Sequence, residues 1–194
     1  MSRIASTTPP EGAAIPERHP KAPPIGSKIP SHFGHCFGCG DLHPTGLHLV
    51  AYAGAGANIT AQFTVTENHQ GAPGLAHGGL LSLAFDEALG KLMWLLRSPA
   101  VTGRLETDFL KPVPMGSTLH ITAEITGQVN RKVYTSAEGR LNSVDGPVVV
   151  RAAALYVIVP MDHFLNNAPK EYLAQLAKTP EILAFADPDF EINP

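Results

Sequence analysis

The segment from His69 to Gly90, HQGAPGLAHGGLLSLAFDEALG, joins a glycine-rich turn to an almost apolar helical run. Gly78 and Gly79 stand where that run begins, and further along it Asp86 interrupts the apolar residues. The first amide groups of a helix have no partner within the helix, and glycines leave them open to approach. A partly buried acid costs free energy unless it is paired or used. We therefore expect this segment to decide the fold and to carry the chemistry.

The apolar pattern predicts one helix over residues 78–96. When residues are placed at about 100° per step, most apolar side chains fall on one broad arc. That arc contains Leu81, Ala84, Phe85, Ala88, Leu89, Leu92, Leu95 and Leu96. Asp86 lies on a second side with Ser82 and Met93, whereas Glu87 and Lys91 form an i,i+4 pair on a third. A helix that is apolar over most of its circumference has to be enclosed by other elements.

Alternating apolar residues predict strands before and after this helix. The predicted strands cover residues 47–52, 57–66, 101–113, 117–130, 131–142 and 146–159. The links between the later strands are short, which favours antiparallel pairing because parallel strands need long crossovers. About five or six antiparallel strands wrapped around one long central helix form the hotdog fold, which belongs to the α+β class. We predict that fold.

The length of 194 residues predicts one domain with tails rather than two domains. Residues 1–30 are rich in proline, and we expect an extended arm that is mobile or laid over a neighbouring surface. Because the arm lacks the apolar content to fold alone, its removal is expected to leave the melting temperature nearly unchanged. Residues 31–160 are predicted to form the hotdog domain. Residues 161–194 are predicted to form a helical tail, with a short helix within residues 168–186.

The composition excludes several classes of protein. A formal net charge of −3 gives no reason to expect a nucleic-acid partner. The proline-rich start lacks the apolar segment of a signal peptide, and polar residues interrupt the longest apolar run, so no membrane span is expected. The two cysteines imply no disulfide framework. These features predict a soluble, cytoplasmic protein.

The glycine pair and Asp86 each have two interpretations. Backbone amides at the start of a helix can stabilise charge on a carbonyl oxygen, but a tight turn needs glycine for steric reasons alone. A carboxylate near an activated carbonyl can attack it or deprotonate a water molecule. The alternative is an acid that is hydrogen-bonded at a contact between subunits.

Three segments together resemble a known family. They are HQGAPGLAHGG followed by Asp86, the later VTGRLETDFLKPVP, and the upstream CFGCGDLHPTGLHL. They resemble the hotdog-fold acyl-CoA thioesterases of the phenylacetate-pathway type, over roughly Cys36 to Val159. The resemblance implies hydrolysis of acyl-CoA to a free acid and CoA, in fatty acid metabolism, by a homodimer or a dimer of dimers. It also implies that the acid and the glycine turn of one site come from different subunits.

Site residues follow from the resemblance position by position. His77, Gly78 and Gly79 match the histidine-glycine-glycine turn, and the Gly79 amide is expected to donate to the thioester oxygen. Asp86 matches the general base or nucleophile. Thr102, sixteen positions further on, matches a threonine that holds the attacking water. The resemblance also places His69 just before the turn, where it is expected to line the acyl pocket.

Basic residues at strand ends provide candidate contacts for the phosphates of CoA. These residues are Lys111, Arg131 and Lys132, and the last two are the stronger candidates. Ordinary solvated surface charges are an equal alternative.

The segment HCFGCGDLH offers Cys36, Cys39, His35 and His43 as possible zinc ligands. A structural zinc site normally combines two separated pairs of ligands, and His35 beside Cys36 is strained for tetrahedral binding. We expect a glycine-rich turn with buried thiols instead, no metal and no cofactor. A redox role for the Cys-x-x-Cys pair has no supporting helix in the pattern.

Two other functions on the same fold compete with the enzyme. A non-catalytic acyl-CoA-binding protein would need neither Asp86 nor Thr102. A hydratase would need a histidine base with a partner acid, and the sequence lacks that pattern.

Overall fold

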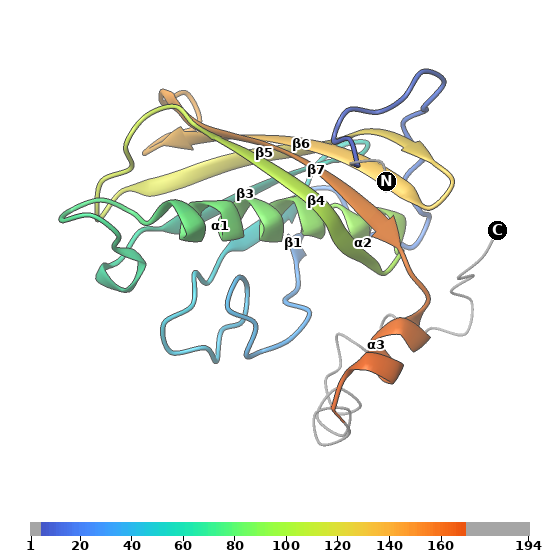
Figure 1. Cartoon of the computed structure of the whole chain (residues 1–194), viewed down its shortest axis with the longest axis horizontal. Coiled ribbons are helices and arrows are strands. Elements are labelled where there is room, and N and C mark those ends of the chain that lie inside the picture. The colour runs from blue at the N-terminus through green and yellow to red at the C-terminus, as the bar shows by residue number, and fades with distance from the viewer. Residues whose placement is uncertain (1–4, 170–194) are drawn as a thin grey trace.

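The computed structural model describes residues 5–169 of the chain, in which a curved sheet lies over one long helix (Figure 1). The strands are β1 (Lys28–Ile29), β2 (Val50–Ala53), β3 (Asn58–Thr64), β4 (Ala100–Phe109), β5 (Thr118–Val129), β6 (Lys132–Leu141) and β7 (Val148–Ile158). The helices are the 3-10 helix η1 (Glu67–His69) and the α-helices α1 (Gly78–Lys91), α2 (Met93–Leu96) and α3 (Met161–Asn167).

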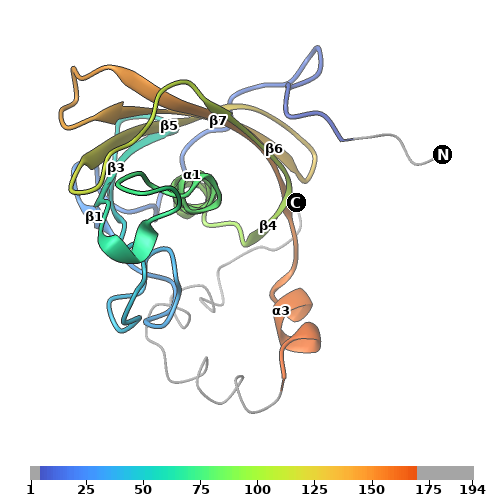
Figure 2. The same cartoon turned by 60° about the vertical axis from the view of Figure 1, so that its left-hand side comes forward.

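The seven strands form one sheet in the order β1-β2-β3-β5-β6-β7-β4, and all neighbours are antiparallel. Seen almost along α1, the sheet curves around the helix (Figure 2). This arrangement is the predicted hotdog fold. The strand count exceeds the predicted five or six because β1 adds a two-residue strand to the edge. At the other edge, within the part of the chain that the structure describes, β4 pairs only with β7.

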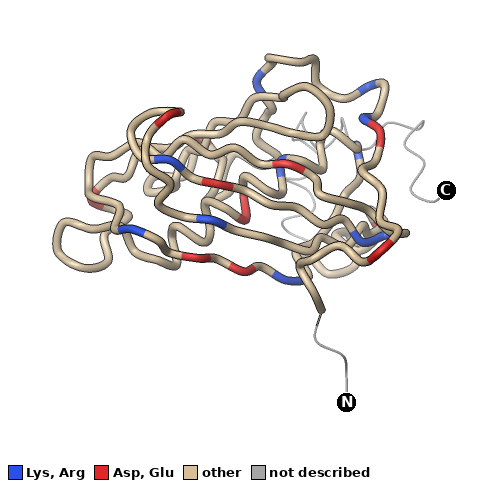
Figure 3. Tube along the Cα trace, turned by 90° about the horizontal axis from the view of Figure 1, so that it is seen from above, with Lys and Arg blue, Asp and Glu red and all other residues tan. Residues whose placement is uncertain are grey.

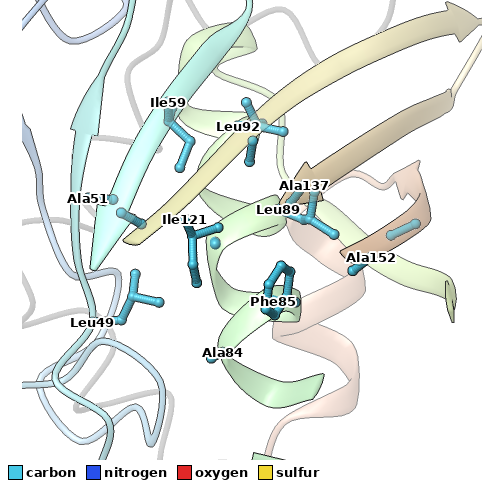
Figure 4. Packing of buried hydrophobic residues seen from close by; sticks show 14 of the residues in the cluster. Leu49, Ala51, Ile59, Ala84, Phe85, Leu89, Leu92, Ile121, Ala137 and Ala152 are labelled. Atoms are coloured by element: carbon cyan, nitrogen blue, oxygen red, sulfur yellow. The ribbon is translucent and has the colours of Figure 1, made fainter. Parts of the chain in front are cut away.

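The core lies between α1 and the concave face of the sheet (Figure 4). On the helix, Phe85, Leu89 and Leu92 have no exposed surface. They face strand residues such as Ile59 and Ile121, each 1% exposed. Burying a side chain of this size stabilises the fold by about 1.5–3 kcal/mol. The broad apolar arc of the sequence is therefore the surface that the sheet encloses.

The helical segment has the predicted extent but is broken once. The amide of Leu92 donates to the carbonyl of Leu89, a tighter turn that separates α1 from α2. Arg97 then ends α2 in the left-handed conformation, with a φ of 50°. The i,i+4 pair of Glu87 and Lys91 also forms, at 3.3 Å, but Lys91 is only 2% exposed.

The arm is part of the packed structure. Residues 1–30 were expected to be mobile or to lie over a neighbouring surface, and their described part, residues 5–30, contacts the sheet. Ile29 pairs within the sheet and is 2% exposed. The Thr7 hydroxyl donates to the Glu106 carboxylate at 2.7 Å, and the Arg18 guanidinium donates to the carbonyl of Gly54 at 2.6 Å. These contacts favour a contribution of the arm to stability, and the effect of its removal on the melting temperature stays a prediction.

The tail begins with α3, which lies within the predicted helical tail but before the short helix expected in residues 168–186, and α3 extends away from the sheet (Figure 1). The helix predicted within residues 168–186 lies almost entirely outside the described residues. No helix between residues 5 and 169 has the length and apolar character needed to cross a membrane. Acidic and basic residues are interspersed over the sheet seen from above (Figure 3), and no single-sign surface of the kind that binds nucleic acid gathers there.

Candidate active site

The glycine turn presents one open amide. His77 is the N-cap of α1, and its Nδ1 atom accepts a hydrogen bond from the Gly79 amide at 2.9 Å. The amides of Leu80 and Leu81 donate to the carbonyl of His77. Among the described residues, the Gly78 amide has no hydrogen-bond acceptor. The sequence pointed to the Gly79 amide as the oxyanion donor, whereas the geometry leaves the Gly78 amide available and occupies that of Gly79.

A shallow apolar groove adjoins this turn. It has a volume of about 290 Å³ and is lined by Leu75, Ala76, Leu81, Phe109, Leu110, Lys111, Pro112 and Val113. The Phe109 ring lies against the turn: a Cβ atom placed on Gly78 would be 3.5 Å from the Cζ atom of Phe109. Phe109 is nevertheless 53% exposed. Phe109 thus lines the groove and also lies beside Gly78.

Asp86 lies two turns further along α1 and is held by two hydroxyl groups. The Thr102 hydroxyl donates to Asp86 Oδ1 at 2.8 Å. The Tyr156 hydroxyl donates to the same oxygen at 3.1 Å and to the main-chain carbonyl of Asp86 at 2.7 Å. The Oδ2 atom has no partner among the described residues, and the side chain is half-buried. One carboxylate oxygen is thus held by two hydroxyl groups, while the other has no hydrogen-bond partner in the part of the chain that the structure describes.

A β-bulge positions Thr102. The register between β4 and β7 shifts between Thr102 and Arg104, so that Gly103 is the extra residue. Bulges re-aim side chains and are common beside active sites. Here the bulge lies in the strand at the free edge and coincides with the residue that binds Asp86.

Sequence reasoning missed Tyr156. The side chain is 3% exposed, and burial together with the nearby Asp86 carboxylate raises the pKa of its hydroxyl well above the usual value. The phenol therefore remains a donor at neutral pH. In the sequence, the hydroxyl of Tyr156 is the one polar side-chain group within the apolar strand AAALYVIV. The pattern could not reveal that this hydroxyl reaches α1.

The turn and the acid of one chain cannot act on the same carbonyl group. Gly78 and Asp86 are eight residues apart on α1. A helix rises by 1.5 Å per residue, so they are separated by roughly 12 Å along its axis. An oxyanion donor and an attacking oxygen both need to lie about 3 Å from the reacting group. One chain alone therefore does not bring the Gly78 amide and the Asp86 carboxylate to the same reacting group.

The structure does not bring the other candidate residues to this position. His69 is 2% exposed, and its ring nitrogens contact the Thr66 amide and the carbonyl of Gly46. Its own carbonyl accepts the His77 amide, so its visible role is to hold the turn. Lining of the acyl pocket by His69 stays a prediction.

The three basic candidates do not form one group. Lys111 follows the end of β4 and lines the groove beside the glycine turn. Lys132 pairs with Val157, which pairs with Val101 at the start of β4. Along β4 the two ends are separated by roughly 26 Å. Within one chain, Lys111 and the Arg131–Lys132 turn thus lie at opposite ends of the sheet, and their binding of CoA stays a prediction.

The cysteine segment has a different set of neighbours from the one predicted. Cys36 and Cys39 lie close together, but the His35 ring is tilted against that of Phe33 and the His43 ring packs edge-on to Phe37. The residues that approach the thiols are His32 and Glu87. Sequence reasoning missed both, because Glu87 had been assigned only to its pair with Lys91.

Comparison with known proteins identifies relatives of the central part of the chain. Residues 73–145 match the model of the Thioesterase superfamily. The chain is 30% identical over 88 residues to acyl-coenzyme A thioesterase THEM4 of Xenopus laevis, covering 45% of this chain and 39% of that protein. It is 36% identical over 76 residues to THEM4 of Bos taurus, covering 39% of this chain and 30% of that protein. The matched region thus spans only about a third of the length of these curated relatives.

Solved structures agree on the fold. A thioesterase superfamily protein is 25% identical, with a TM-score of 0.58 and coverage of 71% of this chain and 70% of that one. The Escherichia coli PaaI protein of the phenylacetic acid degradation operon is 21% identical, with a TM-score of 0.54 and coverage of 59% and 81%. A Streptococcus pneumoniae thioesterase solved with coenzyme A is 20% identical, with a TM-score of 0.50 and coverage of 53% and 82%. The chain has the hotdog fold of these proteins, and its central segment, residues 73–145, matches the Thioesterase superfamily.

Proposed function

We propose that the chain is an acyl-CoA thioesterase that hydrolyses a thioester to a free acid and CoA. The observation that carries the proposal is the Asp86 carboxylate, which has one oxygen held by Thr102 and Tyr156 and the other without a hydrogen-bond partner among the described residues. It lies on the same helix as an open amide at Gly78, so two antiparallel copies of that helix would complete two sites.

In the general-base route, Asp86 Oδ2 takes a proton from a water molecule, and the water oxygen attacks the thioester carbon. The Gly78 amide stabilises the negative charge that forms on the carbonyl oxygen. Collapse of the tetrahedral intermediate breaks the carbon–sulfur bond, and the proton passes from Asp86 to the departing CoA thiolate. In the nucleophilic route, Asp86 itself attacks and displaces the CoA thiolate, and water then hydrolyses the resulting mixed anhydride.

The proposal includes a homodimer. The distance between Gly78 and Asp86 along α1 requires two chains, and β4 offers an unpaired edge for the second one. That edge carries Thr102, so pairing there would bring the Asp86 cluster to the boundary between subunits. A dimer of dimers would preserve the same site.

Two comparisons support this assignment of roles. The Streptococcus pneumoniae thioesterase was solved with coenzyme A. Variants of the same protein replace an aspartate, and a threonine sixteen positions later, with alanine. Asp86 and Thr102 have the same spacing. A cytoplasmic location, a phenylacetate-type substrate and a place in fatty acid metabolism stay predictions.

The test is hydrolysis of a panel of CoA thioesters with acetyl, medium-chain, long-chain and aromatic acyl groups, measured by release of the CoA thiol. We expect turnover of at least one thioester, with a preference set by the apolar groove beside Gly78. Tight binding of acyl-CoA without hydrolysis of any thioester above the spontaneous rate would identify a binding protein instead.

A further inference from the structure

A cluster of potential metal ligands lies on the side of α1 that faces away from the sheet. It comprises His32, Cys36, Cys39 and Glu87, whose ligand atoms all lie within 4.8 Å of one another. The first three come from the loop between β1 and β2, which passes below the helix in two views (Figures 1 and 2). Glu87 comes from α1 itself and directly follows Asp86, so the two acids serve different clusters.

The distances between these atoms fit a tetrahedral ion. His32 Nδ1 lies 3.3 Å from Cys39 Sγ and 3.8 Å from Glu87 Oε1. Cys36 Sγ lies 3.5 Å from Glu87 Oε2. In a tetrahedral zinc site with bonds of about 2.0–2.3 Å, neighbouring ligand atoms are separated by roughly 3.3–3.8 Å. The four side chains therefore already lie close to the positions that such an ion requires.

The loop is shaped to let Glu87 reach the thiols. A side chain at Gly38, between the two cysteines, would clash with the Glu87 carboxylate. The amide of Gly40 donates to the carbonyl of Cys36 at 2.8 Å, which closes a tight turn around the cysteine pair. The sequence thus places glycine where the carboxylate approaches the main chain.

The charges around the cluster also balance when a divalent ion binds to the two thiolates. Lys91 is 2% exposed, and its Nζ atom lies 3.3 Å from Glu87 Oε1 and 2.9 Å from the carbonyl of Pro30. Two thiolates and one carboxylate carry three negative charges, which Zn²⁺ and the Lys91 ammonium would neutralise.

We propose that His32, Cys36, Cys39 and Glu87 bind a zinc ion. Thiolate and imidazole ligands favour zinc over magnesium or calcium, and four protein ligands leave no open position for substrate. The ion is structural: it fastens the loop to α1 one residue away from Asp86. This inference does not depend on the proposed thioesterase activity. It replaces the expectation that the segment is a turn with buried thiols and no metal, and it uses a different ligand set from the one containing His35 and His43.

The test measures metal in the untagged full-length chain. Elemental analysis of the purified protein is expected to give about one zinc per chain. After replacement with Co²⁺, the spectrum is expected to show the visible bands of tetrahedral cobalt and a thiolate-to-cobalt charge-transfer band. His32→Ala removes a ligand whose side chain is 47% exposed, so the fold should survive while zinc affinity falls by at least about tenfold. The matched control is His35→Ala, which changes an exposed histidine of the same loop outside the cluster and should keep both metal and affinity.

Cys36→Ser and Glu87→Gln provide independent checks, with circular dichroism to confirm folding. Both are expected to lower the zinc content and to remove or shift the cobalt bands. A folded protein that contains no zinc and binds neither Zn²⁺ nor Co²⁺ in titration would overturn the proposal. Zinc binding that is unchanged in His32→Ala and Cys36→Ser would place the ion elsewhere. A disulfide between Cys36 and Cys39 after expression in a reducing cytosol would also contradict it. Mass spectrometry would detect this disulfide as the loss of two hydrogen atoms.

Discussion

The hydroxyl group of Tyr156 binds Asp86 twice, at the main-chain carbonyl oxygen (2.7 Å) and at the carboxylate oxygen Oδ1 (3.1 Å). The first contact ties β7 to the middle of α1, and the second helps to orient the carboxylate. Because Tyr156 is buried and its partner is the acid that we assign to catalysis, the residue positions Asp86 without needing to touch substrate.

Replacing Tyr156 with phenylalanine should therefore lower kcat and leave KM almost unchanged. A hydrogen bond to a charged group contributes about 1.5–3 kcal/mol, which corresponds to a loss of roughly 10–100-fold in rate if the bond matters fully in the transition state. Steady-state kinetics of Tyr156→Phe would measure this split. Tyr134→Phe is the control, since Tyr134 is also buried and in the sheet but donates no hydrogen bond to Asp86. An equal loss of kcat in both variants would mean that the hydroxyl of Tyr156 acts only through packing.

The Gly78 amide can be removed without disturbing the helix. Gly78 occupies the first helical position, where proline is well tolerated, and the preceding His77 has the extended conformation (φ −71°, ψ 130°) that proline requires. Gly78→Pro should lower kcat by about 10²–10³, the usual cost of losing one oxyanion donor. Gly78→Ala is the matched control, because its Cβ atom would meet Phe109 at an ordinary contact distance of 3.5 Å and the amide is kept. If both variants behaved alike, the amide would not be the donor.

The two-chain site makes a further prediction about mixed dimers. Asp86→Asn and Gly78→Pro should each be nearly inactive alone. If the two are unfolded and refolded together in equal amounts, about half of the dimers are mixed, and each mixed dimer contains one intact site. Activity should then return to roughly a quarter of the wild-type value. Recovery of no activity, with the mixed dimer verified by mass spectrometry, would mean that each site is built from a single chain.

The arm should contribute to stability. Ile29 is 2% exposed and pairs within the sheet, so Ile29→Ala is expected to destabilise the protein by about 2–5 kcal/mol. Ile25→Ala is the control, because Ile25 lies in the same arm but is 68% exposed. Denaturant unfolding would compare the two midpoints. A difference of less than about 0.5 kcal/mol, the range of ordinary surface substitutions, would show that the arm is dispensable after all.

The fold could be predicted because its signals were local and periodic. The apolar arc of residues 78–96 and the alternating strands each identify a buried face, and short links between strands leave antiparallel pairing as the simple choice. β1 could not be predicted in this way. It has only two residues, lies in a proline-rich context, and owes its place to pairing with β2.

The site was predictable to a smaller degree. Asp86 and Thr102 were paired through a family resemblance, and the structure places them 2.8 Å apart. The open amide at Gly78 could not be predicted, because it depends on the rotamer that turns His77 Nδ1 toward Gly79. Tyr156 and Glu87 meet their partners across large separations in sequence, and no periodicity encodes such contacts.

The most direct measurement of the central claim is steady-state hydrolysis of a good acyl-CoA substrate by Asp86→Asn, with circular dichroism to confirm folding. The substitution is nearly isosteric and leaves the Gly78 amide and the groove in place. The account predicts a folded variant with KM close to that of the wild type and kcat lower by about 10²–10⁴, the usual cost of losing a general base. A folded variant that keeps more than about a tenth of the wild-type kcat would contradict it, because loss of a general base or nucleophile lowers the rate by more than that.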